Sequence, residues 1–309
     1  MADKALNKNV LFIYNPYSGR GRIKYFLEEI INKLSKAGYR VTIYATQGQK
    51  DATEIVRELH LDKSIIYDMI ICSGGDGTLD EVVKGILNNN MHTTLGYIPS
   101  GTVNDFAHSL GIPMDMVKAT DIIINGKEFK CDIGSLNKEY FTYVAAFGVF
   151  TSVAYSTDQD LKNVLGKLAY FLEGTKQIVD IPSYKIKLTA GEVEIEDEFI
   201  LGMVTNSKSV GGMKTIFLDD TELNDGLFEV TLVKRPNTLS ELTDTIKSLA
   251  THDFSYSDGL VKIFKTSELK IESAEEIAWT LDGENGGKYT EVNIQNHKEA
   301  ITIKVSKDS

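Results

Sequence analysis

The first part of the chain alternates short apolar runs with stretches in which apolar residues recur every three or four positions. The runs predict strands, and the spaced residues predict amphipathic helices. The expected strands are Val10–Tyr14, Tyr39–Ala45, Met69–Ser73 and Thr94–Ile98. Helical spacing is found in Ile23–Leu34, Ala52–Leu59 and Val82–Leu87. This alternation predicts a parallel sheet with crossover helices.

The pattern changes near Cys131–Gly134, and strand-like runs dominate beyond it. These runs are Tyr140–Ala146, Tyr184–Thr189, Phe199–Val204, Leu227–Val233, Leu269–Glu272, Ile277–Leu281 and Ala300–Val305. Two helical stretches interrupt them, about Lys167–Val179 and Leu239–Ala250. The sequence therefore predicts an α/β domain over residues 1–132 and a β-rich domain, a sandwich or sheet layer, over residues 133–309.

Composition narrows the class of protein. Of 309 residues, 42% are hydrophobic and 25% charged, which is ordinary for globular domains. No apolar run approaches the roughly 18 residues that a membrane-spanning helix needs. The net charge of −11 argues against nucleic-acid binding through a basic surface and disfavours unaided adhesion to anionic lipid. Cys72 and Cys131 lie in apolar surroundings, which favours reduced thiols and a cytoplasmic location.

The segment Gly74–Glu81 follows a predicted strand and opens a predicted helix. Its three glycines let the backbone approach a ligand, and a helix N-terminus attracts phosphate. The alternative is a tight turn in which Asp80 and Glu81 only favour the helix start. Spacing alone leaves both open, and neither the P-loop motif nor the dinucleotide fingerprint of Gly-x-Gly-x-x-Gly occurs.

Two further turns follow predicted strands of the same domain, Asn15–Gly19 after the first and Pro99–Phe106 after the fourth. Each alone is compatible with ordinary turn and cap chemistry. In parallel sheets, however, ligands bind beyond the carboxyl ends of the strands. Three such turns at those ends predict a binding site there.

The three turns and the late segment Leu281–Glu284, in this order, resemble the bacterial soluble diacylglycerol kinase and lipid kinase family. That family is related to sphingosine and ceramide kinases, and more distantly to NAD kinases and 6-phosphofructokinases. The resemblance implies an N-terminal α/β nucleotide-binding domain with a parallel sheet and a C-terminal β-sandwich domain, with C-terminal residues able to pack back onto the first. It implies an ATP-dependent kinase that phosphorylates a lipid hydroxyl, diacylglycerol first, to give phosphatidic acid.

The resemblance also implies roles for single residues. Asp282 and Glu284 would be the catalytic acid–base pair, with Glu284 favoured as the base. The nucleotide contacts would be Asn15, Pro16, Tyr17, Ser18, Gly19, Thr46, Gly74, Gly75, Asp76, Gly77, Thr78, Leu79, Asp80, Glu81 and Thr102. Asp80 stands where family members usually carry asparagine, which adds a negative charge near the phosphates.

The implied cofactors are ATP and Mg²⁺. Residues 222–227 resemble the structural magnesium loop of the family, although the proline common before it is missing. The ligands would be the Asp225 carboxylate and the main-chain oxygens of Glu222 and Leu227, since Mg²⁺ prefers oxygen.

The carboxylates Asp282 and Glu284 allow two interpretations. If the segment is extended, residues two apart face one way and both side chains serve catalysis. The alternative is an Asp-Gly turn that closes a hairpin, with both carboxylates solvated. The accompanying motifs favour catalysis.

Two other functions compete with lipid phosphorylation: NAD kinase and a catalytically silent nucleotide-binding regulator. The Gly-Ser-Thr-Ala type of run in NAD kinases is only faintly matched by Thr151–Ser156, and the intact Asp282-Gly283-Glu284 argues against a silent protein. The expected partner is a lipid at the membrane surface, met by transient peripheral association, and a homodimer stays open. Leu161–Val179 is either a helix packed on the sandwich, which is favoured, or a lipid-facing helix.

Overall fold

The computed structural model describes residues 8–62, 64–149, 181–207, 209–210, 213–214, 222–251, 253–257 and 259–307. The chain divides into two compact units, Met1–Cys131 with Glu299–Ser309, and Asp132–Lys298. The predicted helix Lys167–Val179, the lipid-facing alternative at Leu161–Val179 and the run Thr151–Ser156 lie outside the described residues.

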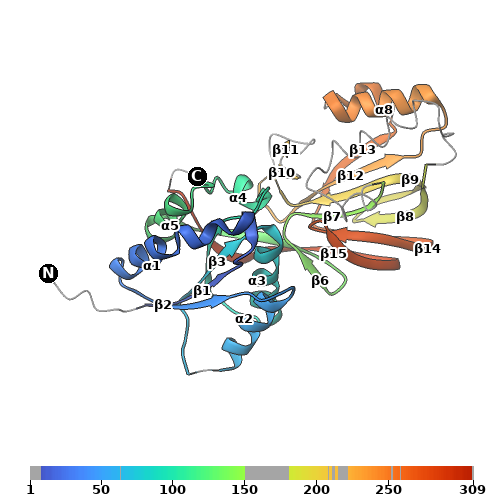
Figure 1. Ribbon diagram of the computed structural model, residues 1–309. Helices are drawn as coiled ribbons and strands as arrows, with labels where there is room; N and C mark the ends of the chain where they lie inside the picture. The colour runs from blue at the N-terminus through green and yellow to red at the C-terminus, as the bar shows by residue number, and fades with distance from the viewer. Residues whose placement is uncertain are drawn as a thin grey trace. The chain divides into compact units, whose positions relative to one another are not determined.

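A parallel sheet forms the centre of the first unit (Figure 1). Its strands lie in the order β2-β1-β3-β4, and the end of β15 adds a further parallel strand beside β4, where Thr302 pairs with Thr94. The strand bounds are β1 Lys8–Tyr14, β2 Tyr39–Ala45, β3 Met69–Gly74, β4 Thr94–Pro99 and β15 Glu284–Val305. Every residue of β3 is buried, as expected for an inner strand covered on both faces.

The helices of the first unit connect these strands. They are η1 Ser18–Tyr25, α1 Leu27–Lys36, α2 Asp51–Leu61, α3 Asp76–Asn88, α4 Asp105–Ser109 and α5 Met116–Asn125. The single helix predicted over Ile23–Leu34 is wrong at its start. A 3₁₀ segment runs to Tyr25 and the α-helix begins at Leu27, because Gly19–Gly21 have positive φ and bend the chain.

Antiparallel pairing dominates the second unit. The strands lie in the order β13-β12-β9-β7-β14-β15, and β8 pairs with β9 and β14. Their bounds are β5 Lys127–Leu136, β6 Glu139–Phe141, β7 Val144–Gly148, β8 Tyr184–Ala190, β9 Val193–Thr205, β10 Ser209–Val210, β11 Met213–Lys214, β12 Phe228–Lys234, β13 Val261–Thr266 and β14 Glu268–Leu281, with α8 Leu239–Thr251 and η3 Phe254–Ser257. The chain is thus mixed α/β, with a β-rich second part.

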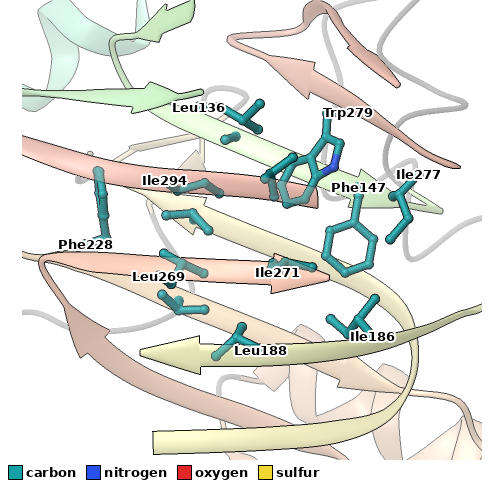
Figure 2. Packing of buried hydrophobic residues seen from close by; sticks show 14 of the residues in the cluster. Leu136, Phe147, Ile186, Leu188, Phe228, Leu269, Ile271, Ile277, Trp279 and Ile294 are labelled. Carbon is teal, nitrogen blue, oxygen red and sulfur yellow. The ribbon is translucent and has the colours of Figure 1, made fainter. Parts of the chain in front are cut away.

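Among the described residues of the second unit, apolar side chains form two clusters, and β7 contributes alternate residues to them. Ala145 and Phe147 lie in the larger cluster, where the ring centroids of Phe147 and Trp279 are 5.0 Å apart (Figure 2). Val144 and Ala146 lie in the other, which α8 joins through buried leucines. A strand buried on both faces explains the continuous apolar run in this part of the sequence.

The strand predicted over Tyr140–Ala146 is interrupted. β6 ends at Phe141 and β7 begins at Val144, so Thr142 and Tyr143 belong to neither strand. Their N–H groups donate to the Asp282 side chain instead of a neighbouring strand. Among the described residues, no helix combines the length and the apolar character that crossing a bilayer requires.

Candidate active site

Three loops of the first unit follow the carboxyl ends of adjacent strands and contact one another. Asn15 follows β1, Gly75 follows β3 and Ser100 follows β4. The N–H of Asn15 donates to the Ser73 carbonyl at 2.8 Å, and the N–H of Ser100 donates to the Gly74 carbonyl at 2.8 Å. The structure therefore brings the three turns singled out in the sequence together at the sheet edge where ligands bind.

Glycines allow the backbones of these loops to touch. Gly19 has a φ of +54°, and a Cβ there would lie 1.8 Å from the Ser100 carbonyl oxygen. A Cβ on Gly101 would lie 2.5 Å from the Gly75 Cα. Contacts between loops thus require glycine at Gly19 and Gly101 whether or not a ligand is bound.

Two asparagine side chains add hydrogen bonds, one from the first loop to α3 and the other within the third loop. Asn15 Nδ2 donates to Thr78 Oγ1 at 3.2 Å. Asn104, in the left-handed region, accepts from the Gly101 N–H at 2.9 Å and donates to the Gly101 carbonyl at 3.0 Å. Asn104 was not among the predicted contacts. Asparagine is favoured in the left-handed conformation of turns, so its presence in the Pro99–Phe106 turn could have indicated this role.

The N-terminus of α3 has the features of an anion site. Its N-cap is Gly75, in extended conformation and without a side-chain cap. Beside it, the hydroxyls of Ser73 and Ser100 are buried, and neither has a hydrogen-bond partner within the described residues. N–H groups of a first helical turn and the positive end of the helix dipole stabilise a bound anion.

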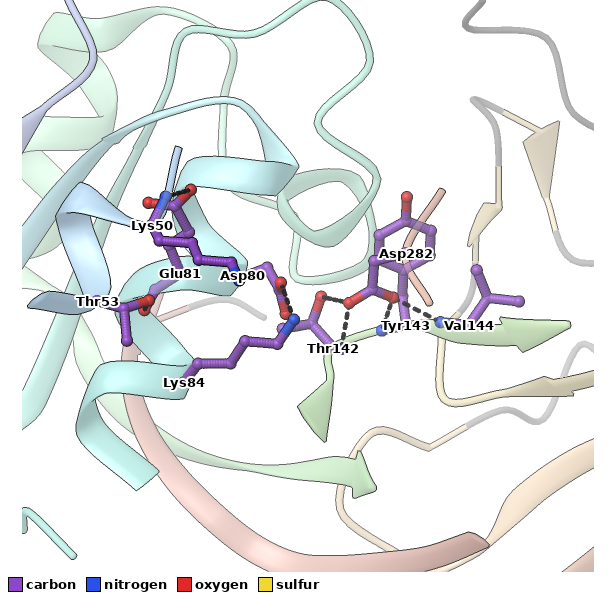
Figure 3. A network of polar contacts seen from close by, with 9 residues as sticks. All are labelled: Lys50, Thr53, Asp80, Glu81, Lys84, Thr142, Tyr143, Val144 and Asp282. Carbon is purple, nitrogen blue, oxygen red and sulfur yellow. Dashed lines mark hydrogen bonds and ion pairs between the residues drawn. The ribbon is translucent and has the colours of Figure 1, made fainter. Parts of the chain in front are cut away.

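Two acidic residues of α3 are held by neighbours (Figure 3). Asp80, nearly buried, lies 2.6 Å from the Lys84 ammonium, one helical turn along. The Glu81 carboxylate accepts from the N–H groups of Lys50, at 2.7 Å, and Ala52, at 3.1 Å. Glu81 thereby caps the start of α2, which has no cap of its own. Lys84 was absent from the predicted site, although its i, i+4 spacing from Asp80 was visible.

The remaining predicted nucleotide contacts differ in exposure. Tyr17 is 79% exposed and Thr102 is exposed, whereas Thr46 is buried after β2 and donates its N–H to the Tyr14 carbonyl at 2.9 Å. Leu79 is fully buried and belongs to the core. Those of intermediate exposure are Pro16, Ser18, Asp76 and Gly77.

In the second unit, Asp282 and Gly283 form a two-residue hairpin turn between β14 and β15. Leu281 pairs with Glu284 across it, and φ is +50° at Asp282 and +84° at Gly283. Positive φ at both central residues is the requirement of a tight hairpin. The extended segment assumed in the sequence analysis is therefore wrong.

The two carboxylates of this turn have different surroundings. Glu284 is exposed, whereas Asp282 is 8% exposed and accepts four hydrogen bonds from Thr142, Tyr143 and Val144 (Figure 3). Burial raises the pKa of the Asp282 carboxyl above its ordinary value, and the four hydrogen bonds oppose that rise. The sequence also allowed a hairpin turn with both carboxylates solvated. The turn is present, but the Asp282 carboxylate is buried and not solvated.

The predicted magnesium loop already contacts two lysines. Asp225 Oδ1 accepts from the Leu227 N–H at 2.8 Å, and Oδ2 lies 3.6 Å from Lys265 Nζ. The Asp225 carbonyl accepts from Lys298 Nζ at 3.3 Å. Lys265 also lies 3.2 Å from the nearly buried Glu229.

Both ammonium groups contact Asp225, the one predicted ligand that would bind through its side chain. Burial lowers the pKa of Lys265, but the Glu229 and Asp225 carboxylates outweigh it and raise that pKa. Glu222, whose main-chain oxygen is a predicted ligand, is exposed. The predicted ligands are one carboxylate and two main-chain oxygens, and a structural Mg²⁺ at this loop stays a prediction.

Family models match most of the chain. One described as "Diacylglycerol kinase catalytic domain" matches residues 9–136, and one described as "YegS C-terminal NAD kinase beta sandwich-like domain" matches residues 144–303. A diacylglycerol kinase of Staphylococcus carnosus is 36% identical, over 98% of this chain and 97% of that protein. A diacylglycerol kinase of Bacillus subtilis is also 36% identical, over 96% of this chain and 97% of that protein.

Solved structures agree with these matches. A Bacillus anthracis structure at 26% identity has a TM-score of 0.78 and covers 98% of this chain and 99% of its own. The crystal structure of a diacylglycerol kinase from the same organism, at 24% identity, has a TM-score of 0.74 and shows the likeness of fold alone; it covers 97% of each chain. The chain therefore belongs to the diacylglycerol kinase family of ATP-dependent lipid kinases.

Proposed function

We propose that this kinase transfers the γ-phosphoryl group of ATP to the free hydroxyl of diacylglycerol, which gives phosphatidic acid. The relatives named diacylglycerol kinase support this acceptor, since their similarity extends over nearly the whole chain and includes the second unit. NAD kinase, the competing assignment, has no comparable support among these relatives.

The convergence of three loops at the start of α3 carries the proposal. ATP phosphates would lie at this helix N-terminus, where backbone N–H groups and the helix dipole stabilise negative charge. The buried hydroxyls of Ser73 and Ser100 are donors that a phosphate oxygen could satisfy. The Lys84 ammonium offsets the Asp80 charge near these phosphates.

Phosphoryl transfer depends mainly on positioning and on neutralising charge. Mg²⁺ that accompanies ATP supplies part of that neutralisation. The acceptor hydroxyl must lose its proton as it attacks, and the exposed Glu284 carboxylate is the group proposed to take it. The Asp282 carboxylate already accepts four hydrogen bonds and is the poorer candidate for the base.

Diacylglycerol resides in a bilayer, so the kinase must meet it at a membrane surface. A chain of net charge −11 gains little from anionic headgroups, which favours transient, peripheral contact. A cytoplasmic location and a homodimer stay predictions of the sequence; sedimentation of the purified chain tests the second.

The test is a panel of acceptors with γ-labelled ATP and Mg²⁺. Diacylglycerol, ceramide and sphingosine are presented in mixed micelles, and NAD is presented in solution. The proposal expects labelled phosphatidic acid as the main product and no labelled NADP. Label in NADP without any lipid product would make the chain an NAD kinase, and ATP binding without transfer would make it a regulator.

A further inference from the structure

The Asp282 carboxylate is surrounded by donors from the joint between β6 and β7 (Figure 3). Its Oδ2 accepts from the N–H of Thr142 at 2.5 Å and from the Thr142 hydroxyl at 2.9 Å. Its Oδ1 accepts from the N–H groups of Tyr143 and Val144, each at 2.9 Å. The N–H of Asp282 donates in turn to the Val144 carbonyl at 2.9 Å. The hairpin turn is thus joined to this segment by hydrogen bonds in both directions.

These bonds leave Asp282 little capacity to take a proton from a substrate. A carboxylate offers about four acceptor positions, and Asp282 uses as many. Its side chain is also buried. A general base needs an oxygen within hydrogen-bond reach of the hydroxyl that it deprotonates, so Asp282 would first have to break its own contacts.

The same bonds fix the backbone from which Glu284 projects. Asp282 has a φ of +50°, a conformation that costs a non-glycine residue free energy and persists only when surrounding contacts hold it. Gly283 follows at +84°, and Glu284 is the first residue of β15. Because Glu284 directly follows the turn, the turn determines where its backbone lies and from which point its exposed side chain starts.

We propose that Asp282 is a positioning residue, which together with Thr142 holds the turn from which Glu284 deprotonates the acceptor hydroxyl. The inference rests on the proposed function and assigns separate tasks to the two carboxylates. Thr142 contributes two of the four donors and has no other assigned role.

Asp282→Asn is the most informative change, because it keeps the shape and replaces one acceptor oxygen with an NH₂ donor. The NH₂ fits best beside Thr142, whose hydroxyl can accept from it, but it then faces the Thr142 N–H, so at least one hydrogen bond is lost. The turn relaxes and Glu284 shifts. A displacement of about 1 Å of a catalytic group lowers turnover on the order of 10²-fold.

The experiment measures kcat against pH for the wild type, Asp282→Asn and Glu284→Gln, with ATP affinity measured by calorimetry. We expect Asp282→Asn to lower kcat about 10²-fold and to leave the ATP Kd unchanged. The fall of kcat at low pH, the acidic limb of the profile, should remain in this variant. Glu284→Gln should abolish that limb. An acidic limb lost in Asp282→Asn and kept in Glu284→Gln would make Asp282 the base and overturn the proposal.

A second pair of variants addresses Thr142 and decides the question if Asp282→Asn fails to fold. Thr142→Val keeps the shape without the hydroxyl, and Thr142→Ser keeps the hydroxyl. We expect kcat to fall several-fold in the valine variant and to recover in the serine variant, at unchanged ATP Kd. Equal kcat in all three proteins would contradict the role of Thr142. Absence of lipid phosphorylation by the wild type would instead contradict the proposed function itself.

Discussion

The Lys84 ammonium lies 2.6 Å from the Asp80 carboxylate, one helical turn away in α3. Asp80 adds a negative charge next to the loop where phosphate is proposed to bind, at a position where the family usually has asparagine. Lys84 compensates for it locally. The departure from the family pattern at Asp80 is therefore compatible with a working nucleotide loop.

Lys84→Met should destabilise the fold by about 1–3 kcal/mol, because it removes the ion partner of a carboxylate that is 5% exposed. It should also weaken ATP binding several-fold, since the Asp80 charge then repels the phosphates. Urea unfolding and calorimetry measure the two effects. The control is the double variant Asp80→Asn with Lys84→Met, which should recover most of both. No recovery would show that Lys84 acts through another contact.

Glu81 was predicted as a nucleotide contact, and its bonds to the start of α2 suggest a test that separates the two roles. Glu81→Ala removes the acceptor for the Lys50 and Ala52 N–H groups, and loss of a helix cap costs about 1 kcal/mol. We expect a lower free energy of unfolding and an ATP Kd close to that of the wild type. Unchanged stability together with much weaker ATP binding would show that Glu81 contacts the nucleotide, as the sequence predicted.

Gly101→Ala should lower the free energy of unfolding by about 1–3 kcal/mol, because the added methyl would lie 2.5 Å from the Gly75 Cα and push two loops apart. Gly48→Ala is the matched control, since nothing lies within 4 Å of a Cβ there. Urea denaturation compares the three proteins. Equal stability of both variants would show that the loops are not packed as described.

Local patterns in the sequence were enough to predict some elements and not others. The strand Tyr39–Ala45 was predicted with the bounds that the structure has. Helix α5 was missed although its signal was present: Asp115 caps it, and Met116, Ala119 and Ile123 recur at helical spacing. No distant contact is needed to predict this helix, because its cap and its apolar spacing are both local.

Long-range contacts explain what the sequence could not show. The break at Thr142 between β6 and β7 arises because this residue donates to Asp282, 140 positions away. Likewise, Glu81 stands within the glycine-rich motif, but its bond to Lys50 links two helices that are separate in sequence. The spacing of the motifs in the sequence predicted which residue types gather at the sheet edge. It could not predict the hydrogen-bond partners of Asp282 and Glu81, because folding brings those partners from distant positions.

Lys265 and Lys298 already contact Asp225, so we predict that they compete with Mg²⁺ for this loop. Without nucleotide, we expect the wild-type Tm to be the same in Mg²⁺ and in chelator. Lys265→Met should lower Tm, since it removes the ion partner of Glu229, which is 2% exposed, and Mg²⁺ should restore part of the loss. A Mg²⁺-dependent rise of Tm in the wild type, abolished by Asp225→Asn, would establish the magnesium site of the sequence analysis.

The central claim is that this chain phosphorylates diacylglycerol with Glu284 as the base. The most direct measurement is transfer of labelled γ-phosphate from ATP to diacylglycerol by the wild type and by Glu284→Gln, at saturating ATP. A positioned base contributes about 10²–10⁴-fold in rate. We therefore predict phosphatidic acid from the wild type, a kcat lower by that factor in the variant, and an unchanged ATP Kd. Turnover of the variant within a few-fold of the wild type would contradict the claim.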